Sequence, residues 1–303
     1  MASVEHIKKH IKSVEDTHKI TNAMYLIAST KLRKAKSDLD HTRPYFNALQ
    51  AQIKRIFRIN SDLDNKYFYP IDNTWKRSDT YACLVITADK GLAGAYNQNV
   101  IKETKKLIDE HPKTKLFVLG EYGRHYFEEH NVKIEQSFMY TASNPTMHRA
   151  REISSILLDL YDKNKVGKIY VIYTDLKSGL VGEAKSTRLI PFHRAQFSDV
   201  NNDKKVVHNL QFYPSLTEVL DNIMQSYISG YIYSALVDSF CCEQEARMQA
   251  MNSANDNAIK LLDELSIQYN RVRQAGITQE ITEISAGAKA RKRKDENVWK
   301  TEE

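Results

Sequence analysis

The chain contains few of the residues that end helices and form turns. Its 303 residues include only ten glycines and six prolines, a composition that favours long helices over a fold rich in tight turns. No stretch approaches the roughly 18 consecutive apolar residues that a membrane-spanning helix needs, and the first residues contain no apolar signal-peptide core. We therefore expect a cytoplasmic protein that can still dock on a membrane complex.

The patterns of metal and nucleophilic sites are also missing. Cys83 and the adjacent pair Cys241 and Cys242 are the three cysteines, an odd number without CxxC spacing, which predicts reduced, semi-buried thiols rather than a disulfide framework. The ten histidines show no paired-ligand spacing such as HExxH. No GxSxG or cysteine–histidine signature is present. We expect no metal, no cofactor and no catalytic residue in this chain.

Two glycine-containing stretches have some likeness to nucleotide-binding loops. The stretch TADKGLAGAYN at 87–97 lies between a predicted strand and a predicted helix, where backbone N–H groups can bind phosphate, but it is not GxGxxG. The stretch GLVGEAKS at 179–186 resembles a phosphate loop in which Ala184 replaces the glycine before the lysine. Residues 187–192 then predict a strand instead of the helix that a phosphate loop opens. We predict that both are structural.

The N-terminal segment has the clearest pattern in the chain. Apolar or small residues recur at alternating steps of three and four, the heptad spacing of a coiled coil. About 55 residues at about 1.5 Å each predict a helix about 80 Å long, which Pro44 should kink or loosen. The seam positions are Val4, Ile7, Ile11, Val14, His18, Thr21, Tyr25, Ala28, Leu32, Ala35, Leu39, Thr42, Phe46, Leu49, Ile53 and Ile56.

A second long segment closes the chain after Pro214 and Ser215, which are suited to a helix start. Its seam is diluted by polar and small residues, so a uniform zipper is not expected. The two long segments can fold back on each other as an antiparallel pair, whereas a homodimer of parallel rods is the alternative geometry. The seam positions are Leu216, Leu220, Ile223, Tyr227, Gly230, Ser234, Val237, Cys241, Gln244, Met248, Met251, Asn255, Ala258, Leu262, Leu265, Tyr269 and Val272.

The middle of the chain predicts a Rossmann-like α/β domain with a mainly parallel sheet, since short apolar runs alternate with amphipathic ones. Strands are predicted at 81–86, 115–119, 168–173 and 187–192, and helices at 97–110, 122–130 and 147–164. The predicted organisation is an N-terminal coiled-coil helix at 1–60, an α/β domain at 78–195, a C-terminal coiled-coil helix at 210–290 and a charged, disordered tail at 291–303.

Positive charge is concentrated at the N-terminus. The first 58 residues hold twelve Lys and Arg against five Asp and Glu, a net charge of +7 in a chain of net +6, so an acidic partner should meet this stretch. The basic runs at 31–36 and 291–294 have the clustered cations that nucleic acid needs. A solvated helix face explains them more simply. A coiled-coil scaffold and a basic nucleic-acid-binding protein are the two alternative functions.

Several blocks, in order along the chain, match the pattern of one known family. They are Ile7, Lys8 and residues 11–14, KITNAM at 19–24, Ala28 and Ser29, KLRKA at 31–35, RPY at 43–45, TADKGLAGAYN at 87–97, EQ at 243–244, ARM at 246–248, Ala250, Met251, Ala254, DN at 256–257, YN at 269–270, RQA at 273–275 and ITQEITEI at 277–284. With these blocks the chain resembles the γ subunits of F-type ATP synthases, and the resemblance covers residues 1 to about 290.

This resemblance implies a non-catalytic subunit of the proton-transporting two-sector ATPase. The coiled coil would be the central shaft inside a ring of three α and three β subunits, with one copy per complex. The α/β domain would rest on the ε subunit and the membrane c-ring at the cytoplasmic face of the plasma membrane. Rotation of an asymmetric shaft would then couple ion flow to ATP synthesis or hydrolysis. No cofactor and no nucleic acid is implied.

The resemblance also implies which residues meet the partners. Met24 and Arg247 match positions near the acidic β-subunit loop that senses rotation, to which a basic shaft is electrostatically suited. Contacts with the β-subunit catch are implied for Arg247, Gln274, Thr278 and Glu280. The apolar tip that turns in the bearing of the ring is implied to contain Ile277, Ile281 and Ile284.

Three features depart from the family pattern. Cys241 and Cys242 replace small residues, and Ala93 and Ala95 replace the usual Cys and Gly of the turn at 87–97. Family members commonly end near Ala288, whereas this chain continues with a charged tail. Charged residues are costly inside an apolar sleeve, so we expect the tail to protrude beyond the ring or to be disordered.

Overall fold

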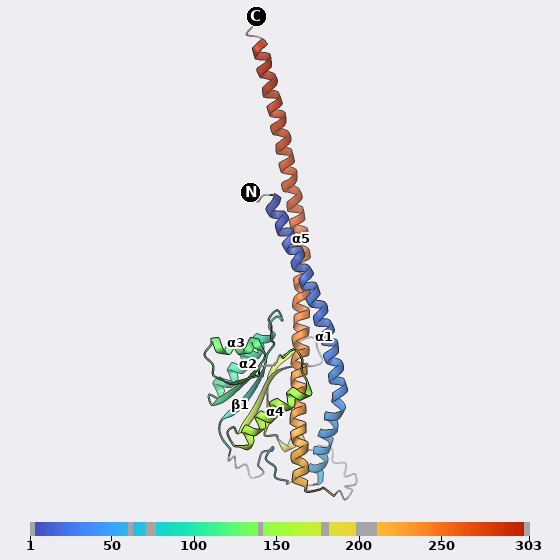
Figure 1. Ribbon diagram of the computed structural model, residues 1–303, viewed down its shortest axis with the longest axis vertical. Coiled ribbons are helices and arrows are strands. Elements are labelled where there is room, and N and C mark those ends of the chain that lie inside the picture. The colour runs from blue at the N-terminus through green and yellow to red at the C-terminus, as the bar shows by residue number, and fades with distance from the viewer. Residues whose placement is uncertain are drawn as a thin grey trace. The chain divides into compact units, whose positions relative to one another are not determined.

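The computed structural model describes residues 4–59, 63–70, 77–138, 142–176, 182–197 and 211–299. Two compact units are present. The first contains Met1–Tyr25 and Met251–Glu303, and the second contains Leu26–Ala250. The two longest helices, α1 (Val4–Ile59) and α5 (Leu216–Trp299), contribute to both units (Figure 1). Each unit therefore contains residues of both long helices.

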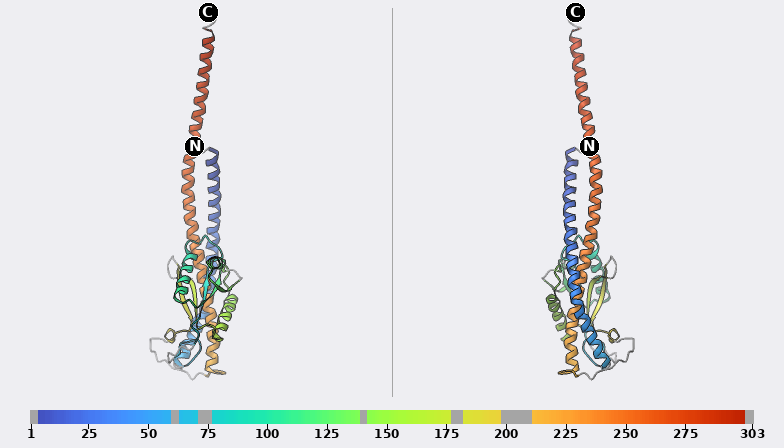
Figure 2. Two further views of the ribbon diagram at one scale, coloured as in Figure 1. Left: turned by 90° about the vertical axis from the view of Figure 1, so that its left-hand side faces the viewer. Right: turned by 90° about the vertical axis from the view of Figure 1, so that its right-hand side faces the viewer.

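The first unit is an antiparallel pair formed by the start of α1 and the second half of α5 (Figure 2). Its apolar cluster consists of Ile7, Ile11, Val14, Ala258, Leu262, Leu265, Tyr269 and Val272. All eight belong to the predicted heptad seams. Thr21 and Asn255, two polar seam positions, are joined by a side-chain hydrogen bond. The helices pair within one chain, and intrachain pairing is thus the geometry of this seam.

In the second unit α5 is buried on more than one face. The seam residues Leu220, Val237 and Cys241 are buried there, and so are Met224 and Ile232, which lie off the predicted seam. A helix that is apolar around most of its circumference is enclosed by other elements. The heptad pattern therefore describes only one of the contacts that this part of α5 makes.

A five-stranded sheet forms the centre of the second unit, with strand order β3-β2-β1-β4-β5. The strands β1 (Tyr81–Ile86), β2 (Thr114–Leu119), β3 (Ile134–Ser137) and β4 (Lys168–Asp175) run parallel, and β5 (Glu183–Ile190) pairs antiparallel with β4. The predicted mainly parallel sheet is confirmed. The short strand β3 was not predicted, because IEQS has only one apolar residue and no clear alternation.

The alternating side chains of β1 belong to two different cores. Leu84 and Ile86 belong to the large core that also contains residues of α1, α4 (Met147–Asp162) and α5. Cys83 and Val85 belong to the opposite core with residues of α2 (Tyr96–Glu110) and α3 (Glu121–Glu129). Successive strand residues point to opposite faces, so the domain has helices on both faces of the sheet (Figure 1).

The ends of the long helices differ in part from the expectation. Ser215 caps α5, since its side-chain oxygen accepts from the Glu218 N–H at 3.2 Å, as the start signal predicted. The helix α1 is continuous through Pro44. The tail was predicted to be disordered from residue 291, but α5 continues to Trp299. Residues 291–299 contain Lys, Arg and Glu, which favour helix, and no Gly or Pro. Residues 300–303 lie outside the described part.

A glycine allows α1 and α5 to approach within the second unit. A Cβ atom added at Gly230 would lie 1.8 Å from Cε1 of Phe46, so the ring occupies the space that a side chain would need. We expect Gly230→Ala to lower the free energy of unfolding by about 2 kcal/mol. Such a close contact should cost about 3 kcal/mol, the upper end of the usual range for overpacking. The better helix propensity of alanine offsets about 1 kcal/mol of this cost.

Gly276 provides the matched control, because it lies in the same helix with no heavy atom within 4 Å of an added Cβ. Gly276→Ala should stabilise the protein by up to about 1 kcal/mol. Urea-induced unfolding of both variants measures the difference. Equal effects of the two substitutions would contradict the close approach at Gly230.

Candidate functional site

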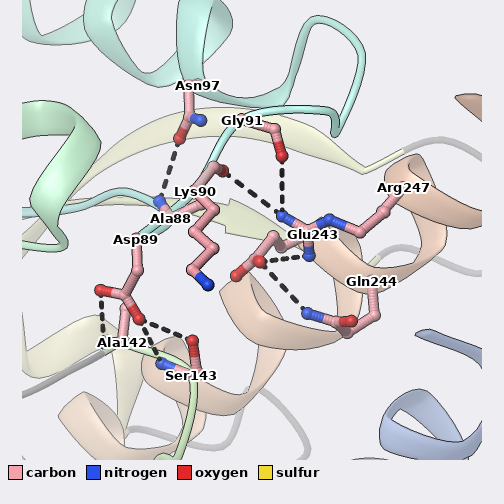
Figure 3. A network of polar contacts seen from close by, with 10 residues as sticks. All are labelled: Ala88, Asp89, Lys90, Gly91, Asn97, Ala142, Ser143, Glu243, Gln244 and Arg247. Carbon is pink, nitrogen blue, oxygen red and sulfur yellow. Dashed lines mark hydrogen bonds and ion pairs between the residues drawn. The ribbon is translucent and has the colours of Figure 1, made fainter. Parts of the chain in front are cut away.

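A network of polar contacts joins α5 to the turn after β1, at residues 87–97 (Figure 3). The turn leads from β1 into α2. Leu92 and Gly94 have positive φ angles of 61° and 54°, the left-handed conformation that glycine adopts at no steric cost and leucine rarely. The turn thus reverses sharply and leaves the Leu92 side chain 64% exposed.

Side chains from both ends of the turn fix its backbone. The buried Asn97 side chain accepts a hydrogen bond from the Ala88 N–H at 2.9 Å. Thr87 donates through Oγ1 to the Leu119 carbonyl at 3.0 Å, and the same oxygen accepts from the Gly123 N–H at 3.0 Å. The bond of Asn97 satisfies a backbone group of the turn, and the two bonds of Thr87 connect the start of the turn to β2 and α3. The polar side chains of the motif therefore hold the turn in place.

The carboxylate of Asp89 is also engaged within the protein. It accepts hydrogen bonds from the backbone N–H groups of Ala142 and Ser143 at 2.9 and 3.1 Å and from the Ser143 hydroxyl at 2.6 Å. Three donors to one carboxylate form a strong set of bonds because the acceptor is charged. Asp89 thereby anchors the segment that precedes α4.

Arg247 of α5 connects the helix to this turn. Its guanidinium donates to the backbone carbonyls of Lys90 and Gly91 at 3.3 and 3.1 Å, and to the Glu243 carboxylate at 2.5 Å. Gln244 donates to the same carboxylate at 3.1 Å. Arg247 is only 9% exposed and Glu243 3%, so the ion pair is shielded from water. We call this set the Arg247 clamp, consisting of Arg247, Glu243 and the carbonyls of Lys90 and Gly91.

Burial dominates the electrostatics of the clamp. It raises the pKa of Glu243 above the ordinary value, while the neighbouring Arg247 acts in the opposite direction. A buried ion pair is costly to break by removing one partner, because the remaining charge is left without compensation. Glu243 and Arg247 thus depend on each other in the folded state.

The adjacent cysteines have a packing role in the structure. Cys83, Cys241 and Cys242 are free and buried, and burial raises the pKa of Cys241 and Cys242 to about 12. The Cys242 sulfur lies so close to Gly182 that a Cβ there would be 2.6 Å from it. Cys242 therefore fills the space that Gly182 leaves open beside β5.

The two nucleotide-loop likenesses differ from true phosphate loops in their surroundings. Residues 183–186 of the second stretch lie in the strand β5, and Lys185 forms an ion pair with Asp175 at 2.5 Å. A phosphate loop would place this lysine at the start of a helix. Residues 179–181 lie outside the described part. The strand predicted at 187–192 begins earlier, at Glu183, and ends at Ile190.

The residues implied to contact partners have different environments. Met24 is half-buried, and Gln274, Thr278 and Glu280 are exposed on α5. Ile277, Ile281 and Ile284 are 47%, 62% and 73% exposed. Arg247 differs from all of these, because it is buried in the clamp. The half-buried Asp89 and the buried Glu243 were not assigned a role, although both lie within the blocks that carry the resemblance.

Among the described residues, no group of three or more His, Cys, Asp and Glu side chains has a geometry that could hold a metal ion. A search of the same residues finds no helix that is both long and apolar enough to cross a membrane. The polar groups around 87–97 are hydrogen-bonded to one another, so the chemistry that the site supports is mechanical connection of α5 to the domain.

The architecture defines a stalk-type protein, in which the first and last helices pair and an α/β domain is inserted between them in sequence. Comparisons with known proteins give the family. The family model described as ATP synthase matches residues 3–290. The ATP synthase gamma chain of Ruminiclostridium cellulolyticum is 40% identical over 291 residues, which cover 95% of this chain and 98% of the relative.

Other relatives agree in length and in fold. The sodium ion specific ATP synthase gamma chain of Acetobacterium woodii is 33% identical, with 95% of this chain and 98% of the relative covered. A chain in the Euglena gracilis mitochondrial ATP synthase OSCP/F1/c-ring structure has a similar fold, with a TM-score of 0.67 at 15% identity over 95% of this chain and 94% of that one. The chain belongs to the ATP synthase gamma chain family.

A further carboxylate of α5, outside the clamp, affects stability. Burial and the neighbouring Asp175 raise the pKa of Asp238 on α5 from 3.8 to about 6, while Arg43 and Lys185 act against this shift. A raised folded-state pKa contributes stability that is present below about pH 3.8 and is lost as the pH rises through about 6. The folded protein at pH 8 therefore holds this carboxylate in an unfavourable charged form.

We expect Asp238→Asn to raise the free energy of unfolding by up to about 3 kcal/mol at pH 8, since about two pKa units correspond to that energy. The gain should widen from about pH 3.8 to about pH 6 and then stay constant. Urea unfolding at both ends of this range measures it. Asp263→Asn, at an exposed position of α5, is the control without such a trend. A gain that does not change with pH would refute the assignment.

Proposed function

We propose that this chain is the central rotor of an F-type ATP synthase and couples ion flow through the c-ring to ATP synthesis or hydrolysis on the α and β subunits. Family membership supports this role. The observation that carries the proposal is the exposed end of α5: every residue from 273 to 289 is exposed. A long helix with exposed isoleucines gains stability when a partner covers it.

The proposed partners are those of the central stalk: three α and three β subunits around one copy of this chain, with the ε subunit and the c-ring at its α/β domain. The complex would lie at the cytoplasmic face of the plasma membrane. This chain would supply no catalytic residue of its own. One relative is named sodium ion specific, so the family as such does not choose between proton and sodium ion as the coupling ion.

The residues proposed to meet the ring are those that the family resemblance implies. Ile277, Ile281 and Ile284 would turn in its apolar bearing, since exposed isoleucines at helical spacing form an apolar stripe. Three polar residues of α5 would contact the β-subunit catch, namely Gln274, Thr278 and Glu280. Met24 and Arg247 are proposed to lie near the acidic sensing loop of β. The basic N-terminal stretch would favour that loop electrostatically.

The test is co-expression of this chain with the α and β subunits of the same organism. A complex of three α, three β and one copy of this chain, with ATP hydrolysis that depends on it, would support the rotor function. A chain that stays outside the complex and elutes as a homodimer would instead support a coiled-coil scaffold. Tight, steeply salt-dependent binding to nucleic acid would support the other alternative.

We expect the triple variant Ile277→Ser, Ile281→Ser and Ile284→Ser to weaken retention of the chain in the complex. Each buried isoleucine contributes about 1.5–3 kcal/mol, and serine forfeits this contribution. Size-exclusion chromatography at decreasing concentration measures the dissociation. The control is Ile267→Ser, the same substitution at a 71% exposed position of α5. Equal retention of the triple variant and the wild type would argue against the apolar bearing.

A further inference from the structure

The Arg247 clamp is the contact between α5 and the α/β domain that is best suited to resist rotation. Three other hydrogen bonds between described residues of the domain and α5 join uncharged groups. Ser154 of α4 and Ser229 lie 2.7 Å apart through their hydroxyl oxygens, the Thr174 N–H of β4 donates to Ser239 at 3.2 Å, and the hydroxyl oxygens of Tyr173 and Tyr231 lie 3.4 Å apart. The clamp differs from these bonds because its donor is a charged guanidinium.

The clamp also has a distinctive position along α5. The contacts at residues 229, 239 and 247 extend over about 27 Å, from the rise of about 1.5 Å per residue. Arg247 is the last of the three in sequence, three residues before the second unit ends at Ala250. A twisting force that enters α5 from its C-terminal half therefore reaches the domain first through Arg247.

Apolar packing alone would resist rotation of α5 less than the clamp does. Apolar burial is not directional, so a helix can rotate slightly against an apolar surface at a small cost in free energy. A guanidinium has a planar, rigid array of donors, and here it reaches two consecutive carbonyls and one carboxylate. Rotation of α5 against the turn changes the distances from the guanidinium to the two carbonyls, whereas Glu243 lies on α5 and moves together with Arg247.

We propose that Arg247 is a positioning residue that locks the turn at residues 90–91 to α5, so that the α/β domain and the helix rotate as one body. The proposal rests on the proposed rotor function for its mechanical consequence. It differs from a direct contact with the β subunit, because the guanidinium acts within this chain. Glu243 orients that guanidinium and compensates its charge.

Arg247→Lys separates the guanidinium geometry from the charge. Lysine keeps the positive charge and can pair with Glu243 at the same i,i+4 spacing, but its single ammonium lacks the fork that reaches both carbonyls. In the purified full-length chain, amide hydrogen exchange of residues 87–96 should become about tenfold faster, since a bond to a charged group contributes about that factor. Arg247→Gln should have at least the same effect.

The controls use the same helix. Arg271→Lys and Arg271→Gln alter an exposed arginine of α5 and should leave the exchange of residues 87–96 unchanged. Glu243→Gln keeps the donors to the carbonyls and should have a smaller effect than Arg247→Lys. If residues 87–96 of Arg247→Lys exchange at the wild-type rate, the proposal is overturned, because the positive charge alone would then be sufficient to hold the turn.

The second readout is the ratio of ATP-driven ion uptake to ATP hydrolysis, measured with the assembled complex in vesicles. We expect Arg247→Lys to hydrolyse ATP with a loss of ion uptake per ATP, and Arg271→Lys to match the wild type. If residues 87–96 exchange faster in Arg247→Lys but the ratio of ion uptake to ATP hydrolysis is unchanged, the positioning role is overturned. The bonds of Arg247 would then be purely structural. Failure of the wild-type chain to assemble would overturn the proposed function and the coupling with it, whereas the exchange data decide the clamp independently.

Discussion

The structure depends on the burial of one very long helix in two different ways. In the first unit α5 presents a single apolar seam to α1, in a cluster that includes Val14 and Leu265. In the second unit α5 is enclosed, with Met224 and Ile232 both fully buried. The same helix can therefore be a shaft with an exposed end and the central core element of a folded domain.

Enclosure of α5 imposes demands on its neighbours. Small residues are needed where other elements come closest, as at Gly230 beneath the Phe46 ring and at Gly182 against Cys242. Charged residues in this region must be paired internally, because burial disfavours an isolated charge. Arg247 meets this demand with Glu243 and two carbonyls. A buried charge that is satisfied in only one orientation also specifies the angle of the helix.

The turn after β1 shows how a nucleotide-loop layout can serve a structural purpose. In a dinucleotide-binding fold the corresponding turn leaves its N–H groups for a phosphate. Here Asn97 and Asp89 accept from backbone N–H groups of this chain, and the carbonyls of the turn face a guanidinium. A positively charged guanidinium binds peptide carbonyl oxygens, whereas a negatively charged phosphate binds peptide N–H groups. The α/β architecture is thus compatible with a mechanical function.

The long helices, the mainly parallel sheet and the eight seam residues of the first unit could be predicted from the sequence, because heptad and strand periodicities depend only on local geometry. The enclosure of α5 in the second unit and the inward orientation of Arg247 are visible only in the folded chain. These features result from contacts between residues distant in sequence, such as Arg247 and Gly91. A periodic pattern indicates which face of a helix is apolar, but it does not indicate to which carbonyl a buried arginine donates a hydrogen bond.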